Sequence, residues 1–82
     1  MARYVKKPLP IEAIQWTGDN FSDVAAFLDS TPPQLENGDI LIYTLEGVMH
    51  APISSYIIRG IAGEYYPCIK SVFERSYERI DD

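Results

Sequence analysis

The 82-residue sequence has almost no cysteine and almost no histidine, two residue types that often carry metal-site and thiol chemistry. Cys68 is the only cysteine, so no disulfide can form within the chain and a multi-cysteine metal site is excluded; this usage fits a reducing cytoplasm. His50 is the only histidine, and it has no partner nearby in sequence for a zinc site or a catalytic triad. We therefore expect no metal, no cofactor and no catalytic residue, and we predict that the protein is not an enzyme.

Basic residues are also few, since seven Lys and Arg stand against twelve Asp and Glu, for a formal net charge of −5 at pH 7. A phosphate backbone repels an acidic protein, so direct DNA binding is not expected. No apolar run approaches the length of a membrane span, and the basic N-terminal segment MARYVKKPLP lacks the apolar stretch of a signal peptide. We expect a cytoplasmic protein without membrane contact.

Short apolar runs separated by turns predict one domain, 1–82, of the α+β class. We expect a small, mostly antiparallel sheet or meander of about five strands, with one short helix packed on it and a one-turn helix near the C-terminus. The clearest strand patterns lie at 11–16, 39–45, 48–51, 56–59 and 64–66, and 76–80 is long enough for a final strand. Apolar residues on both faces of 39–45 predict a central strand that is covered on both sides.

Local signals set the expected ends of these elements. Asn20 is the predicted N-cap of the first helix, whose apolar stripe is Phe21, Val24, Ala25 and Leu28. Thr31-Pro32-Pro33 is expected to stop that helix, with a loop at 34–37. Pro67 is expected to end the strand at 64–66. Ser71 and Glu74 match a capping box, which predicts a single helical turn with Val72 and Phe73 facing the core.

Six short motifs follow one another in a fixed order: YxKKP at 4–8, EAxQWTGDN at 12–20, TLEG at 44–47, YIIRG at 56–60, GEYYPC at 63–68 and FExxY at 73–77. In this order and spacing the chain resembles a family of small bacteriophage and prophage proteins. It departs from them at Ser54-Ser55, where relatives usually carry Gly-Asp, so no role of that aspartate carries over. The resemblance implies a phage origin and a location in the cytoplasm of an infected bacterial host, but it implies no reaction.

The aromatic residues give the best functional lead, because they are numerous for so small a core. Tyr and Trp bury broad faces and keep a polar tip, which suits interfaces and ligand pockets. With Arg59, Lys6 and Lys7 they could stack a base and hold a phosphate in a self-associated pocket. The plainer interpretation is that three or four of them are core residues and the others are ordinary strand residues. We predict that binding rests on Trp16, Tyr56, Arg59, Glu64, Tyr65 and Tyr66.

Together these features predict a phage accessory protein that acts by non-catalytic binding. The bound partner would be a host component, either a defence protein or a small nucleotide-type signal held between subunits of a homo-oligomer. Two alternatives remain open. One is a minor virion or assembly component whose sheet edge docks on a larger phage protein. The other is a small enzyme that uses Glu64 with His50 or Cys68.

Overall fold

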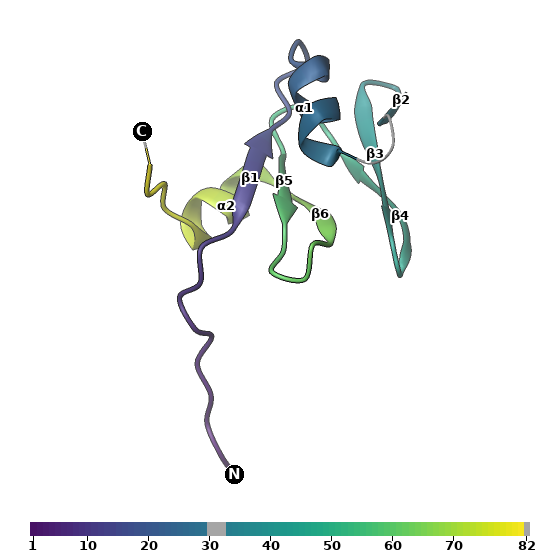
Figure 1. The fold of residues 1–82 in the computed structure, drawn as a ribbon. Coiled ribbons are helices and arrows are strands. Elements are labelled where there is room, and N and C mark those ends of the chain that lie inside the picture. Colours follow the sequence, from purple (N-terminus) through teal and green to yellow (C-terminus); the bar gives the residue numbers. More distant parts are fainter. Residues whose placement is uncertain (30–32, 82) are drawn as a thin grey trace.

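Two three-stranded antiparallel sheets and two helices make up the computed structural model, which describes residues 1–29 and 33–81 (Figure 1). This is the predicted α+β class, with six strands in place of about five and two small sheets in place of one. The helix α1 lies near both sheets, whereas α2 lies beside the sheet that contains β1 and β5 (Figure 1). The N-terminal segment runs away from both sheets as an extended arm (Figure 1).

The first sheet has the order β1 (Glu12–Gln15), β5 (Tyr56–Arg59) and β6 (Tyr65–Cys68). In the central strand, neighbouring isoleucines point to opposite faces and both are buried, so this sheet is covered on both sides. The last strand continues through Pro67, which pairs with Ile57, where we predicted the strand to end. That prediction was wrong because β6 is an edge strand, in which the missing N–H of a proline need not cost a ladder hydrogen bond.

The second sheet has the order β2 (Gln34–Glu36), β3 (Asp39–Thr44) and β4 (Gly47–Ala51). The strand β2 replaces the predicted loop at 34–37. It forms because Asn37 and Gly38 both adopt positive φ, 51° and 88°, which makes a two-residue hairpin whose twist matches the flanking strands.

The strand β3 is central, as predicted, but only one of its faces is covered. Ile40 and Ile42 are buried, whereas Tyr43 is 59% exposed and Leu45, just beyond the strand, is fully exposed. The prediction of two covered faces was wrong because only the inner face of this sheet meets the core. The outer face of the second sheet is therefore an exposed surface.

The helix α1 (Phe21–Leu28) begins where expected and buries Val24 and Leu28. Asn20 precedes it, but its side chain serves the preceding turn: Oδ1 accepts from the Thr17 backbone N–H at 3.0 Å, and Nδ2 donates to the Gln15 carbonyl at 2.8 Å. The helix ends at Leu28, and Thr31 and Pro32 of the predicted stop signal lie outside the described residues.

The helix α2 (Lys70–Ser76) has seven residues, about two turns, where one turn was predicted. It begins after Ile69, so Ser71 already lies inside the helix and the predicted capping box with Glu74 does not form. Phe73 is partly buried as predicted, whereas Val72 is 40% exposed. The predicted strand at 76–80 was also wrong, since the last described residues continue from the helix without strand pairing.

Buried residues of the described part of the chain form a core between the two sheets and α1. It is built from buried residues of both sheets and the helix, namely Trp16, Val24, Leu28, Ile40, Ile42, Ala51 and Ile57. Trp16 is 2% exposed, and its indole Nε1–H donates to the Gly38 carbonyl at 2.9 Å. This bond ties the end of β1 to the hairpin of the second sheet. Neither helix in the described part of the chain has the length and hydropathy needed to cross a membrane.

Candidate partner-binding groove

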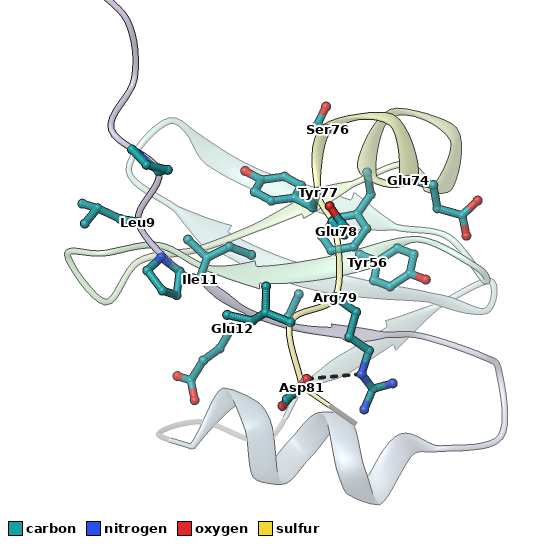
Figure 2. A pocket seen from close by; sticks show the side chains of 15 residues that line it. Leu9, Ile11, Glu12, Tyr56, Glu74, Ser76, Tyr77, Glu78, Arg79 and Asp81 are labelled. Atoms are coloured by element: carbon teal, nitrogen blue, oxygen red, sulfur yellow. Dashed lines mark hydrogen bonds and ion pairs between the residues drawn. The ribbon is translucent and has the colours of Figure 1, made fainter.

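A groove of about 810 Å³ lies on the α2 side of the first sheet, between chain segments 8–13 and 76–81 (Figure 2). Its floor is aromatic. The rings of Tyr56 and Phe73 are stacked, with centroids 3.9 Å apart and planes 8° apart, and Phe73 stacks in turn on Tyr77 at 4.9 Å and 26°. These rings come from β5, from α2 and from the residue that directly follows α2. The stack follows from helical spacing, because residues 73 and 77 lie one turn apart and β5 presents Tyr56 to the same side.

The rim of this aromatic groove is acidic. Its lining residues include three exposed carboxylates, those of Glu74, Glu78 and Asp81, and one exposed guanidinium, that of Arg79; Glu12 also lines the groove, but its carboxylate is paired with Arg59 at 2.9 Å. The guanidinium is already paired, since Arg79 Nε lies 3.2 Å from Asp81 Oδ1 (Figure 2). The local field therefore favours a positively charged ligand and opposes a phosphate.

Arg59, which we predicted to bind a partner, lies on the other face of the sheet and holds the fold together. Its Nη1 donates to Glu12 Oε1 at 2.9 Å, and its Nη2 donates to the Phe27 carbonyl at the end of α1 at 2.8 Å. Nε and Nη2 also donate to the Tyr65 hydroxyl at 3.1 and 2.8 Å. The hydrogen bond to Tyr65 is the main reason that the pKa of Arg59 lies above its usual value, against the opposing effect of burial.

Tyr65 takes part in the same contact. We call this contact of Arg59, Tyr65, Glu12 and Phe27 the latch. Its hydroxyl donates to the Phe27 carbonyl at 3.1 Å, and its ring meets the Phe27 ring edge-on at 5.8 Å. The guanidinium of Arg59 lies 5.1 Å from the Phe27 ring centroid and 5.3 Å from that of Tyr65. The latch therefore uses hydrogen bonds, cation–π contact and a helix C-terminal carbonyl to hold α1 against the sheet.

The remaining predicted residues are spread over other parts of the fold. Trp16 is a core residue. Glu64 lies in the turn between β5 and β6, where its Oε1 accepts from the Ala62 backbone N–H at 3.1 Å. Tyr66 lies on the same face as Tyr56, since it is opposite Ile58 in the register. Burial, followed by a hydrogen bond with Tyr77, raises the pKa of Tyr66.

The six predicted residues therefore do not form one site. Trp16, Arg59 and Tyr65 lie on the α1 side of the first sheet, and only Tyr56 lines the groove. Lys6 and Lys7 are exposed in the N-terminal arm. Sequence reasoning missed Phe73, Tyr77 and the acidic rim. The four-residue spacing of Phe73 and Tyr77 was the available signal, but a one-turn helix would not have brought the two rings together.

Two residues of the enzyme alternative, His50 and Cys68, lie on strands of different sheets. His50 lies on β4 of the second sheet, where Nδ1 is 3.3 Å from Asp39 Oδ2 and Nε2 is 3.7 Å from Glu36 Oε2. Cys68 lies on β6 of the first sheet and is partly buried. Within residues 1–29 and 33–81, no group of His, Cys, Asp and Glu has a metal-binding arrangement. Among the described residues, the aromatic groove is the candidate site with the clearest geometry, and no family model, curated protein or solved structure matches the chain.

Proposed function

We propose that this chain is a small bacteriophage accessory protein that acts by binding and not by catalysis. In this proposal it works in the cytoplasm of the infected host and neutralises a host protein by holding an extended basic segment of that protein in the groove. The observation that carries the proposal is the combination of a stacked aromatic floor with a rim on which Glu74, Glu78 and Asp81 outnumber the one guanidinium, Arg79, which is itself paired with Asp81.

The chemistry of the groove selects its ligand. Lys and Arg side chains lay their aliphatic stems on apolar surface, place their charge over aromatic faces and end against carboxylates. A nucleotide-type signal is less well supported, because its phosphates would meet the acidic rim. Arg59, the cation that we expected to hold a phosphate, directs its three donor nitrogens into the latch. We therefore favour the host protein over the nucleotide as partner.

Fluorescence anisotropy with labelled ten-residue peptides tests this proposal. A basic series, an acidic series and a set of di- and oligonucleotides are titrated with the full chain. We expect saturable binding of the basic peptides alone, and a loss of roughly tenfold or more in affinity for Tyr77→Ala, because a stacking and cation–π surface is removed. Glu78→Lys should weaken the binding of basic peptides more than Tyr77→Ala does.

The matched control is Asp23→Lys, the same kind of charge reversal at an exposed position of α1 that does not line the groove. It should leave peptide affinity within about twofold, because an exposed charge at a distance is screened. Absence of saturable binding by basic peptides would overturn the proposal, and binding of nucleotides alone would establish the nucleotide alternative.

An assembly component is the second candidate function, and one observation favours it. The outer face of the second sheet exposes a cross-strand pair of Tyr43 and Val48, beside the fully exposed Leu45 at the hairpin. A larger phage protein could cover this surface. Quantitative mass spectrometry of purified particles distinguishes the two functions, since an assembly component is present at a fixed copy number and an inhibitor of a host protein is not.

A further inference from the structure

The N-terminal arm, residues 1–10, differs in charge from all that follows it. It carries three of the seven basic residues, Arg3, Lys6 and Lys7, and no acidic residue, so that residues 11–82 hold four basic and all twelve acidic residues. Every residue of the arm is exposed, including Tyr4 at 93% and Val5 at 92%. An arm with this composition has the chemistry that the groove selects, namely positive charges next to an aromatic and an aliphatic side chain.

The root of the arm directs it away from the groove of its own chain. Pro8 and Pro10 favour extended backbone for themselves and for the residues before them. The Leu9 N–H donates to the Lys7 carbonyl at 2.8 Å, which fixes the direction of the chain across Pro8. Residues 1–7 then leave the body of the protein (Figure 1) and, when extended, reach about 23 Å.

We propose that the arm of a second copy occupies the groove, so that two copies exchange arms around a two-fold axis. In this arrangement Lys6 and Lys7 of one copy meet Glu74 and Glu78 of the other. Pro8, Leu9 and Pro10 line the groove of their own chain. The two exchanged arms would therefore cross next to both grooves and form one continuous interface.

This inference rests on the proposed function and adds its regulation. A host segment that enters the groove must displace the arm, so the dimer is the resting form and partner binding yields monomers. The apparent affinity for a partner then equals the intrinsic affinity multiplied by the fraction of grooves that no arm occupies.

Native mass spectrometry and light scattering on the full chain at low salt test the exchange. We expect a wild-type dimer, whereas Lys6→Glu/Lys7→Glu and Glu74→Lys/Glu78→Lys should each raise the dimer dissociation constant at least tenfold. An equimolar mixture of these two variants should form a heterodimer, because the reversed arm of one variant then meets the reversed groove of the other, and the unchanged arm meets the unchanged groove. The controls carry the same charge changes away from the groove: Lys70→Glu/Arg75→Glu and Asp23→Lys/Glu46→Lys, all at exposed positions. They should dimerise as the wild type does.

A wild type that is monomeric at every concentration, or dimers that survive both reversals, would overturn the exchange. The heterodimer is the decisive result, because loss of folding in either variant could not produce it. Peptide binding separates this inference from the proposed function. If a peptide with the sequence of residues 2–10 binds the Lys6→Glu/Lys7→Glu variant while the wild type is monomeric, the groove is a binding site and only the exchange is refuted. If neither protein binds this peptide, the exchange is refuted, and if the basic peptide series also fails to bind, the proposed function fails as well.

Discussion

Replacing Tyr65 by Phe removes one oxygen atom from the latch and tests whether the latch stabilises the fold. The Tyr65 hydroxyl accepts two N–H groups from Arg59 and donates to the Phe27 carbonyl. The phenylalanine ring keeps the edge-on contact with Phe27. After the substitution, Arg59 Nη2 still reaches the Phe27 carbonyl and Nη1 still reaches Glu12, so the change is confined to the hydroxyl.

The expected cost in the free energy of unfolding is about 1–2 kcal/mol, since a partly buried hydrogen-bonding group loses its partners. For a domain of this size that cost lowers the melting temperature by about 4–16 °C. Urea unfolding followed by circular dichroism measures the change in the free energy of unfolding. Tyr43→Phe is the matched control, because it removes a hydroxyl that donates only to Gln34 Oε1 at 2.8 Å on the exposed face. That change should cost less than about 0.5 kcal/mol. Equal stabilities for the two variants would refute the assignment of a stabilising role to the latch.

Two further predictions concern a titrating group and a turn. Because burial and the Tyr77 hydrogen bond raise the pKa of Tyr66 above 10.0, the folded state keeps Tyr66 protonated to higher pH than the unfolded chain does. Its contribution to the free energy of unfolding is therefore constant below about pH 10 and is lost as the pH rises through the folded-state pKa. Tyr66→Phe should flatten this fall in urea titrations between pH 8 and 11, and an unchanged slope would contradict the assignment. Gly38→Ala should cost about 1–2 kcal/mol in urea unfolding, because φ is 88° there and an alanine is strained in that region. An unchanged midpoint for Gly38→Ala would show that the hairpin tolerates a side chain at this position.

Local patterns predicted those elements whose ends are set by short-range signals. The helix 21–28 has its apolar stripe, and the strands 39–44, 47–51 and 56–59 are bounded by turns. The strand β2 escaped prediction because Gln-Leu-Glu has little strand character of its own. It is imposed by the Asn37-Gly38 turn, whose first residue was predicted to be the last of a loop at 34–37. The predictions at Pro67 and Ser71 were wrong for a similar reason. Proline locally favours the end of a strand and serine favours a helix cap, but Pro67 lies within an edge strand and Ser71 lies inside a helix.

The candidate site was harder to predict, because it depends on which face of the first sheet each side chain occupies. Tyr56 and Arg59 are three positions apart on one strand, so they had to point to opposite faces. That much was available from the spacing. Nothing in the sequence indicated that α1 would cover one face and α2 the other. The groove could therefore be identified only from the way the two helices pack in the structure, and not from the sequence.

The first sheet carries two aromatic clusters on opposite sides with different relations to folding. On the α1 side lie the core and the latch, whereas α2 contributes no fully buried residue. Apart from Ile58, which is 1% exposed on this face, substitutions on the α2 side consequently cost little stability, so the groove can diverge in sequence while the α1 side stays fixed. A protein arranged in this way can follow changes in its partner over evolution without refolding. Relatives with this fold would then share the latch and differ in the floor and rim of the groove.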